Sequence, residues 1–434
     1  MLTSKYLRDN LEAIKESMAK RKSDYPVDEM LKLDEKLRKA NMEVQQLRAE
    51  RNKLSLEIAD KKKKENVVDK DITAKVSEIK KRLDTLEKEL PEDEQRLNTL
   101  LWNMPNILDK SVPEGNPPEA NKVLKKWGTP KEKSIATHED ILGGLNLLDM
   151  ERAAKVSGSR FYYLKGDLVL LEQSLGRYAL DFLAARGYTA ILPPFMLRKK
   201  YYRGVAPLAT FEDALYRSGE SKEAGSLNDI EHMDEELFMI GTAEHPLAAM
   251  HSEELLPAKD LPLKYAGISP CFRREAGAHG KDQKGIFRVH QFDKVEQFIY
   301  CKQEDEDKYF NELLKNSEDI WQSLNIPYQL LLLCSGDTGH QMSKTIDLEC
   351  WFPGQKTYRE LGSCSTARDW QSVRLDIKYD EGSARKYVYT LNNTAISITR
   401  TLACIVENYV NDDGSITVPE VLVKYMGKDR ITKQ

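Results

Sequence analysis

The stretch of sequence that best indicates the fold is Cys271-Phe-Arg-Arg-Glu-Ala-Gly-Ala-His-Gly-Lys-Asp-Gln-Lys-Gly-Ile-Phe-Arg-Val-His-Gln-Phe-Asp-Lys-Val-Glu-Gln297. Its glycines Gly277, Gly280 and Gly285 favour a turn region, because glycine adopts backbone conformations that other residues avoid. The stretch therefore predicts a strand, a loop and a returning strand. Side chains alternate between the two faces of a strand, so one face of the returning strand would carry Arg288, His290, Phe292, Lys294 and Glu296.

That predicted face combines cations, an aromatic ring and a carboxylate, which suits a ligand with phosphates, a flat base and an amine or hydroxyl. Phe292 and Glu296 would lie about 13 Å apart at ~3.3 Å per residue. This is roughly the span between a base and an aminoacyl group in one ligand. Alternation alone leaves a second interpretation open, in which the strand is merely charged and exposed to solvent.

The sequence around this stretch predicts a mixed α+β domain. Helices are expected at 168–183, 304–324 and 395–408, and strands at 188–194, 261–269 and 287–300. Runs of strands flanked by helices are typical of α+β folds. We therefore expect a mostly antiparallel sheet flanked by helices.

The first hundred residues differ, because apolar positions recur there with alternating steps of three and four. Two such runs extend over 30–58 and 72–100, separated by the polar segment 61–70. This spacing is the seam of a coiled coil, so the runs predict an antiparallel helical hairpin. Pro91 lies inside the second run and can kink that helix. A segment rich in proline and glycine follows, so we divide the chain into a hairpin domain, 1–112, and a second domain, 113–434.

Composition limits the remaining possibilities. The 434 residues carry 66 Lys and Arg against 70 Asp and Glu, a net charge of -4, so any nucleic-acid contact must come from local basic patches. The six cysteines form no C-x-x-C pair, which argues against a zinc site. An apolar run of ~18 residues, as needed for a membrane span, does not occur. The beginning of the sequence lacks the features of a secretory or transit segment, so we expect a cytoplasmic protein.

The strand, loop and returning strand resemble motif 2 of class II aminoacyl-tRNA synthetases. The sequence Arg288-Val-His-Gln-Phe-x-Lys-Val-Glu-Gln297 is similar to this motif in the seryl-tRNA synthetases. Other segments resemble that family in the same order, and the resemblance runs nearly from end to end. They are Val156-Ser-Gly-Ser-Arg160, Pro193-Pro194, Gly241-Thr-Ala-Glu244, Glu360-Leu-Gly-Ser-Cys-Ser365, Asp369-Trp-Gln371, Leu391-Asn-Asn-Thr-Ala-Ile-Ser-Ile-Thr-Arg400 and Asp413-Gly-Ser-Ile-Thr-Val-Pro-Glu-Val-Leu422.

The resemblance implies ATP-dependent attachment of L-serine to tRNA(Ser) through a seryl-adenylate, and it leaves open whether tRNA(Sec) is also a substrate. It implies that Arg273 grips the α-phosphate and the serine carboxylate, and that Arg273, Glu296 and Arg400 are the catalytic residues. Glu275 would approach the adenine and Phe292 would stack on it. The full ATP-binding set that it implies is Arg273, Arg274, Glu275, Arg288, Val289, Phe292, Glu360, Leu361, Gly362, Ser363 and Arg400.

For serine and the metal, the resemblance implies two smaller sets. Mg²⁺ would be bound partly by Glu360 and Ser363, opposite Arg288 and Arg400 at the β- and γ-phosphates, and zinc is not expected. The serine-binding set is Thr242, Ala243, Glu244, Arg273, Glu296, Asn392 and Thr394. A site that hydrogen-bonds a substrate hydroxyl can reject an analogue without it by ~10⁴-fold or more, so alanine should be rejected.

The resemblance also implies a homodimer and a tRNA-binding hairpin. Residues Lys61, Lys62, Lys63 and Lys64 at the predicted tip are candidates for phosphate contacts, although a basic loop on such a hairpin is often only solvated. One departure from the family pattern is Thr366-Ala367-Arg368, where an Asn-Cys pair is frequent. Two alternatives remain: a synthetase-like ligase that charges a carrier protein, and an inactive paralogue that only binds RNA.

Overall fold

The computed structural model describes residues 3–65, 70–132, 135–207, 214–218, 236–275, 285–382 and 384–433. The chain divides into two compact units, Met1–Pro105 and Asn106–Gln434. Among the residues described, no helix has both the length and the apolar composition needed to cross a bilayer. The predicted α+β class is confirmed, with a helical hairpin in the first unit and a mostly antiparallel sheet in the second.

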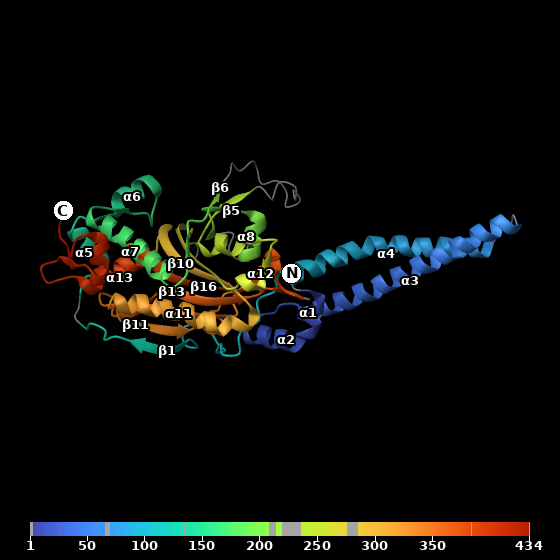
Figure 1. Ribbon diagram of the computed structural model, residues 1–434, viewed down its shortest axis with the longest axis horizontal. Helices are drawn as coiled ribbons and strands as arrows, with labels where there is room; N and C mark the ends of the chain where they lie inside the picture. Colours follow the sequence, from blue (N-terminus) through green and yellow to red (C-terminus); the bar gives the residue numbers. More distant parts are fainter. Residues whose placement is uncertain are drawn as a thin grey trace. The chain divides into compact units, whose positions relative to one another are not determined.

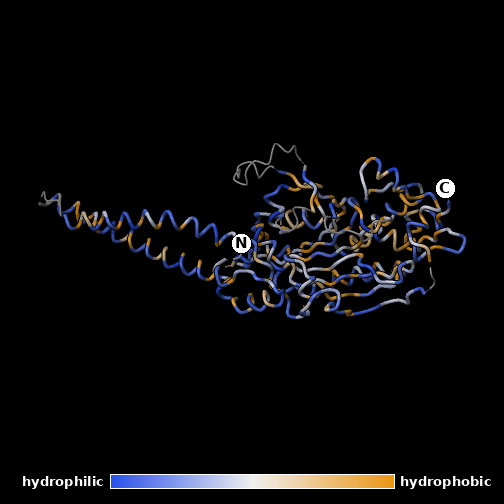
Figure 2. The backbone as a smooth tube through the Cα atoms, turned by 180° about the vertical axis from the view of Figure 1, so that it is seen from behind, coloured by the Kyte–Doolittle hydropathy of each residue, from blue (hydrophilic) through white to orange (hydrophobic). Residues whose placement is uncertain are grey.

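The first unit is dominated by two long helices that run side by side, α3 (Val27–Glu65) and α4 (Lys70–Asn103) (Figure 1). Their predicted apolar seam is confirmed, and its buried members include Val44, Leu83 and Leu86. The alternation of hydrophilic and hydrophobic residues can be followed along both helices in Figure 2. Both helices extend into the segment 61–70 that was expected to be a loop, and residues 66–69 lie outside the described residues. Helix α4 continues through Pro91.

Two short helices, α1 (Ser4–Asp9) and α2 (Leu11–Lys20), precede the hairpin. The hydroxyl of Thr3 accepts a hydrogen bond from the N–H of Tyr6 at 3.2 Å and so caps α1. Nη1 of Arg8 donates to both carboxylate oxygens of the buried Asp34 of α3, at 2.6 and 2.7 Å. This charge-assisted contact ties α1 to α3, because hydrogen bonds between ionised groups are stronger than neutral ones.

The second unit is built on an eight-stranded sheet with the order β1-β11-β12-β13-β16-β10-β9-β4. All neighbours pair antiparallel except β4, which runs parallel to β9 at one edge. The strands are β1 (Lys122–Trp127), β4 (Thr189–Ile191), β9 (Leu263–Phe272), β10 (Gln291–Cys301), β11 (Tyr328–Leu332), β12 (Lys344–Phe352), β13 (Thr357–Arg368) and β16 (Tyr389–Ser397).

One face of this sheet is covered by three helices, α7 (Asp167–Ala184), α11 (Glu306–Ser323) and α13 (Ile398–Tyr409) (Figure 1). Val295 and Ile299 of the central strand β10 belong to the core beneath these helices. Phe298 and Tyr300 face the other way and belong to a second core. The far end of β10 is therefore buried on both faces. Lys294 and Glu296, nearer its beginning, lie on the same face as Phe298 and Tyr300, opposite the three helices.

Shorter elements complete the second unit. Its other helices are α5 (His138–Gly144), α6 (Met150–Ser157), α8 (Lys199–Val205), α10 (Glu244–Ala249), α12 (Trp370–Leu375) and α14 (Glu420–Met426), with single turns η2 (Ala258–Asp260) and η3 (Gln303–Asp305). The small sheets comprise β2 (Leu148–Asp149) with β3 (Tyr163–Leu164), β5 (Met196–Arg198) and β6 (Arg217–Ser218) with β7 (Leu237–Met239), β8 (Leu255–Pro257) and β15 (Ala384–Tyr387) with β14 (Lys378–Glu381), and β17 (Ile416–Thr417) with β18 (Arg430–Ile431).

Two predicted boundaries are wrong. The strand expected from residue 287 begins at Gln291, and residues 285–290 have no regular secondary structure. The helix expected from Ala395 begins at Ile398, because Ala395 and its neighbours still belong to β16, where Ile396 pairs with Val295. A buried apolar run has the same appearance in a strand and in a helix, and here sheet pairing extends the strand.

Candidate active site

Three strands form the floor of the candidate site. Glu296 on β10 lies between Gly267 of β9 and Thr394 of β16 in the sheet register. Phe292 and Lys294 share its face of the strand, as the alternation predicted. A side chain at position 267 would meet Leu247 at 2.8 Å, so this glycine allows helix α10 to approach the floor.

Arg288 and His290 do not belong to that strand face, and this expectation is wrong because the strand begins only at Gln291. Arg288 instead reaches the site region by an ion pair, in which its Nη1 donates to Oε2 of Glu275 at 2.6 Å. Glu275 has a positive φ of 48°. Its carbonyl accepts a hydrogen bond from Arg160 at 3.3 Å. The two ATP candidates Glu275 and Arg288 are thus in direct contact.

A buried charge pair occupies the middle of the floor. The ammonium of Lys294 contacts the carboxylate of Glu296, and it also donates to the hydroxyl of Thr394 at 3.4 Å. The hydroxyl of Thr394 lies 3.4 Å from Oε2 of Glu296. Glu296 is 1% exposed and Lys294 is 6% exposed. Asn392 lies one pleat further along β16, and among the described residues its buried Nδ2 finds no hydrogen-bond partner.

A second carboxylate, Glu244, lies at the start of helix α10. Its N–H donates to the hydroxyl of Thr242 at 3.1 Å, and its Oε1 accepts a hydrogen bond from Gln371 at 3.0 Å. Burial and then the charge of Glu296 raise the pKa of Glu244 to about 7. The neighbouring His245 accepts or donates a 2.6 Å hydrogen bond with the hydroxyl of Tyr202. Ala243, which lies between Thr242 and Glu244 in the sequence, is also buried.

Gln371 is a residue that the site prediction missed, although it lies in the Asp369-Trp-Gln371 segment singled out in the sequence. Its side chain is fully buried, donates to Glu244 and to the carbonyl of Val205 at 3.3 Å, and accepts from Thr390 at 2.7 Å. Every polar atom of the amide is therefore used to hold Glu244 in one orientation. The sequence separation of 127 residues from Glu244 hides this contact from pattern analysis.

Arg273 connects the two halves of the candidate site. It follows β9 directly, and its Nε donates to the carbonyl of Gly241 at 3.0 Å. Its guanidinium lies 5.4 Å from the centroid of the Phe292 ring. Val289 belongs to the same small apolar cluster as Phe292. The next residue after Arg273, Arg274, donates its main-chain N–H to the carbonyl of Ala214 at 2.9 Å. The arginine therefore lies beside both the Glu244 loop and the aromatic candidate for adenine stacking.

A β-bulge brings the two metal candidates to the same face of β13. Glu360 pairs with Glu349 and Ser363 pairs with Asp347, whereas Leu361 is the extra residue in the register. In a regular strand, residues three apart face opposite sides, but the bulge adds one residue and restores a common face. Gly362 lies against β16, where a Cβ would meet Thr394 at 2.8 Å.

Arg400, on the first turn of α13, faces this bulge. Its Nη1 donates to the Glu360 carbonyl at 2.9 Å and lies 3.2 Å from the Glu360 carboxylate. Burial raises the pKa of Glu360, but the charges of Arg400, Arg273 and Arg288 outweigh it, so the net shift is downward. Burial, Glu360 and Glu349 raise the pKa of Asp347 well above its usual value. Glu360 is thus kept ionised among arginines, which is the state needed to bind a cation.

The departure at Thr366-Ala367-Arg368 lies on the other side of the sheet from the candidate site. The hydroxyl of Thr366 and Nε of Arg368 both donate to Oε1 of Glu306, at 2.9 and 3.1 Å. Arg368 also donates to Asp109 at 2.7 Å. These residues hold the start of α11 and do not contact the floor residues.

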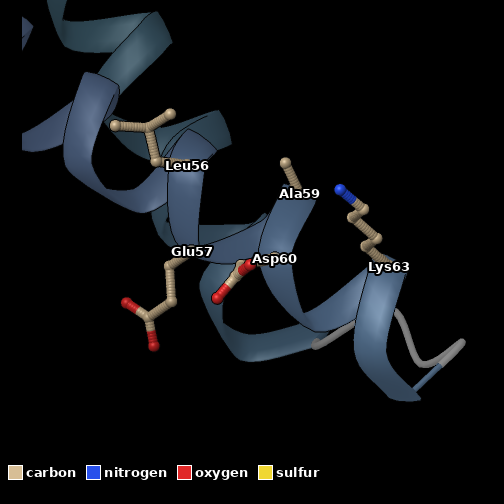
Figure 3. Close-up of a pocket in the computed structure, with 5 residues that line it drawn as sticks. All are labelled: Leu56, Glu57, Ala59, Asp60 and Lys63. Atoms are coloured by element: carbon tan, nitrogen blue, oxygen red, sulfur yellow. The ribbon is translucent and has the colours of Figure 1, made fainter.

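Of the tip lysines, Lys61 and Lys63 have described side chains, and those of Lys62 and Lys64 lie outside the described residues. Lys61 lies 3.7 Å from Glu57, one turn earlier on the helix. An open hollow on this part of α3 is shown in Figure 3, and it is lined by Leu56, Glu57, Ala59, Asp60 and Lys63. The hollow mixes both charges and contains none of the residues described above for ATP or serine.

Known families match both units. Residues 1–108 match the seryl-tRNA synthetase N-terminal domain, and residues 227–409 match the tRNA synthetase class II core domain (G, H, P, S and T). A serine–tRNA ligase of Cenarchaeum symbiosum is 45% identical, and the alignment covers 99% of this chain and 100% of the relative. The chain belongs to the seryl-tRNA synthetase family.

Solved seryl-tRNA synthetase structures agree with this assignment. The Pyrococcus horikoshii enzyme complexed with ATP superposes with a TM-score of 0.92 at 41% identity, covering 100% of both chains. The cytoplasmic serine–tRNA ligase of Naegleria fowleri in complex with AMP has a TM-score of 0.86 at 35% identity, covering 98% of this chain and 96% of that chain. The segment that matches the class II synthetase core, 227–409, contains every candidate residue from Thr242 to Arg400.

The raised pKa of Glu244 predicts a pH-dependent stability. Its carboxyl titrates near 4.5 in the unfolded chain and near 7 in the folded one, so between these values the folded state binds more protons. The free energy of unfolding should therefore fall as pH rises from 4.5 to 7, by about 3 kcal/mol at most, and then level off. Glu244→Gln should lack this component.

Urea unfolding of both proteins between pH 4.5 and 8 measures the effect, since other titrating groups cancel in the difference. The stability of Glu244→Gln relative to the original chain should increase through this range. Glu253→Gln, which removes an exposed carboxylate paired with Lys200, serves as the control. Parallel pH profiles for the original chain and Glu244→Gln would contradict the prediction.

Proposed function

We propose that this chain activates L-serine with ATP to form seryl-adenylate and then transfers the seryl group to tRNA(Ser). The observation that carries the proposal is the pair of buried carboxylates, Glu244 and Glu296, which are close enough for their charges to interact and are near Arg273. Two buried acids suit a ligand with an ammonium and a hydroxyl, because buried polar groups require partners. The names of the relatives support serine and tRNA as the substrates.

In the proposed first step, the serine carboxylate attacks the α-phosphorus of ATP, the bond to the β-phosphate oxygen breaks, and pyrophosphate leaves. Arg273 would stabilise the negative charge that develops on the α-phosphate, and Phe292 would stack on the adenine beside it. Glu275 would accept from the adenine amino group. Arg288 and Arg400 would hold the β- and γ-phosphates. The reaction depends on positioning and charge stabilisation more than on proton transfer.

Serine would be selected by the groups around Glu296. The two carboxylates Glu244 and Glu296, with Thr394 and Thr242, would accept from its ammonium and pair with its hydroxyl. The Nδ2 of Asn392, which has no hydrogen-bond partner in the described part of the chain, would supply a donor on the same face. In the second step, a terminal ribose hydroxyl of the tRNA attacks the seryl carbonyl and AMP leaves, so no external oxidant or reductant is required.

The proposed site also has a place for Mg²⁺. Glu360 and Ser363 share one face of β13 through the bulge, and the arginines keep Glu360 ionised. Magnesium is commonly held by one or two carboxylates together with substrate phosphates. The described residues contain no group of three metal-binding His, Cys, Asp or Glu side chains, and a site completed by the nucleotide needs none. Glu360 and Ser363 would hold the ion, which supplies neutralisation of phosphate charge.

The first test is serine-dependent ATP–pyrophosphate exchange without tRNA, measured across a panel of amino acids. Exchange is expected with serine and not with alanine. Glu296→Ala should lower kcat/KM for serine by about 100-fold or more, because it leaves Lys294 buried without its partner. The KM for ATP should change little.

Glu318→Ala is the matched control, because Glu318 is a buried carboxylate that pairs with Lys125 away from the floor. It should retain exchange. Near-normal serine kinetics in Glu296→Ala would refute the assigned role. Exchange with a different amino acid would replace serine as the substrate, and no exchange with any amino acid from the folded, Mg²⁺-supplied protein would favour the RNA-binding paralogue.

We further propose that the hairpin domain, 1–112, binds tRNA and that 113–434 carries the adenylation chemistry. The exposed surface of the hairpin is rich in charged side chains, and residues 1–108 match a seryl-tRNA synthetase N-terminal domain. The match of this arm to a seryl-tRNA synthetase N-terminal domain favours tRNA over a carrier protein as the acceptor. The cytoplasm is the proposed compartment, as in the name of the Naegleria fowleri relative.

Shortening the hairpin tests this division. Replacing residues 45–77 by a short Gly-Ser turn keeps Leu83 and Leu86 at the base of the seam. Serylation should fall by about 100-fold or more, whereas serine-dependent pyrophosphate exchange should persist, because phosphate contacts dominate nucleic-acid affinity. A double variant, Lys61→Ala with Lys63→Ala, tests the tip lysines alone. Equal loss of both activities would contradict the proposed division.

A homodimer through the β4 edge of the sheet is the oligomer that we propose. Several apolar side chains are exposed just after β4 in the sequence and on α7, which packs against β4. Their exposed fractions are 73% for Leu192, 39% for Phe195, 38% for Met196, 38% for Val169 and 45% for Leu170. Apolar surface of this kind is common at protein–protein interfaces. The Pro193-Pro194 segment lies at the same edge and resembles motif 1, which the family uses for dimerisation.

Sedimentation velocity tests the dimer. The original chain should sediment as a dimer, and Leu170→Glu should shift it toward the monomer because it places charges in the apolar interface. Val123→Glu is the control, since Val123 is similarly exposed at 43% but lies on β1 at the opposite edge of the sheet. A monomeric original chain, or equal effects of the two variants, would refute this interface.

A further inference from the structure

Residues 285–290 lead into β10 without regular secondary structure, and other segments hold their backbone. The N–H of Ile286 donates to Nε2 of His138 at 3.3 Å. The carbonyl of the next residue, Phe287, accepts from Nε of Arg400 at 3.4 Å. Two consecutive residues are thus fixed by side chains, immediately before Arg288.

The ring of His138 has a defined orientation. Because Nε2 accepts the Ile286 N–H, the ring proton resides on Nδ1, which donates to Oε1 of Glu407 at 3.0 Å. The main-chain N–H of His138 donates to the same oxygen at 3.1 Å. The other carboxylate oxygen accepts from the N–H of Gly354 at 3.0 Å. His138 is 4% exposed and Glu407 is fully buried, so these hydrogen bonds satisfy a carboxylate that water does not reach.

Helix α13 supplies both anchors of the segment. Arg400 and Glu407 are seven residues apart, close to two helical turns, and therefore lie on the same side of the helix. Arg400 holds Phe287 directly, and Glu407 holds Ile286 through His138. The fit is close, because a Cβ at Gly285 would lie 2.3 Å from Nε2 of His138. The φ of +70° at Gly285 also favours glycine.

The rings beside this segment extend the same arrangement. Phe287 packs edge-on against Phe352 at 5.4 Å, two residues before the Gly354 that also bonds Glu407. The guanidinium of Arg400 lies 5.0 Å from the Phe287 ring centroid. Helix α5, the turn at 352–354 and helix α13 therefore converge on the residues that precede Arg288.

We propose that His138 and Glu407 form a positioning relay that fixes Arg288 relative to Arg400 and thereby sets the affinity of the site for ATP. This inference rests on the proposed function, in which these two arginines hold the β- and γ-phosphates. His138 is buried behind the backbone of Ile286 and acts through it. It is a positioning residue and does not contact the nucleotide.

The test compares His138→Leu, which removes both hydrogen bonds of the ring, with His138→Gln, whose amide can donate to Glu407 and accept from Ile286. In pyrophosphate exchange, His138→Leu should raise the KM for ATP about tenfold, the order expected for one lost buried hydrogen bond. The KM for serine should change less than twofold. His138→Gln should recover most of the ATP affinity.

Two further variants keep the test decisive. Gly285→Ala pushes the same backbone away from Nε2 without altering His138, and it should also raise the KM for ATP selectively. His251→Leu is the matched control, because the ring of His251 likewise bonds a glutamate, Glu254, at 2.8 Å, and its other nitrogen bonds the hydroxyl of Tyr265, outside the segment 285–290. It should leave the KM for ATP unchanged.

Calorimetric measurement of ATP binding separates this inference from the proposed function, since it needs no catalysis. The relay predicts about tenfold weaker ATP binding by His138→Leu than by the original chain. A protein that binds ATP but lacks serine-dependent exchange would overturn the proposed function, and the ATP dissociation constants would still decide the relay. Equal changes in the constants for ATP and serine, or unchanged ATP affinity in both His138→Leu and Gly285→Ala, would overturn the relay.

Discussion

The buried charge pair on β10 is the constraint on which the rest of the second unit depends. Lys294 and Glu296 both lie on the inner strand β10 and are almost fully removed from water, although both side chains are ionisable. Removing two charges from water costs several kcal/mol per ion, and their attraction recovers this only with good geometry and further hydrogen bonds. The sheet provides that geometry, because β9 and β16 fix the backbone of Glu296 from both sides. A strand that served stability alone would carry apolar side chains here, as Phe298 and Tyr300 do a few residues later.

The second carboxylate makes the arrangement specific. Glu244 is held by Gln371 close enough to Glu296 for the charge of Glu296 to raise its pKa. A cationic ligand reduces the repulsion between two neighbouring carboxylates, whereas a neutral ligand does not. The hydrogen bond that Gln371 donates to its carboxylate prevents Glu244 from turning away toward solvent, and the hydroxyl of Thr242 holds its main-chain N–H. The folded chain thus keeps an unfavourable electrostatic arrangement that a small ammonium-bearing ligand would improve.

The sequence predicts the elements of this fold better than it predicts their contacts. The three-four periodicity was sufficient for the hairpin, because helical packing repeats regularly along the chain. Alternation correctly placed Phe292, Lys294 and Glu296 on one face but wrongly extended the strand back to Arg288. The strand starts later because the N–H groups of Ile286 and His290 and the carbonyl of Phe287 bond to His138, Arg160 and Arg400 instead of to a neighbouring strand. Those partners are distant in sequence, and local patterns contain no information about them.

The bulge at Leu361 shows the same limit within a single strand. Glu360 and Ser363 have the wrong spacing to share a face in regular β structure, and only the extra residue aligns them. The bulge also lets Leu361 join the core under the helices while Glu360 remains beside Arg400. Helix α13 then contacts both the bulge, through Arg400, and the segment before Arg288, through Glu407 and His138. A single helix therefore holds both Glu360 on β13 and the irregular segment that carries Arg288, which β13 could not position by itself.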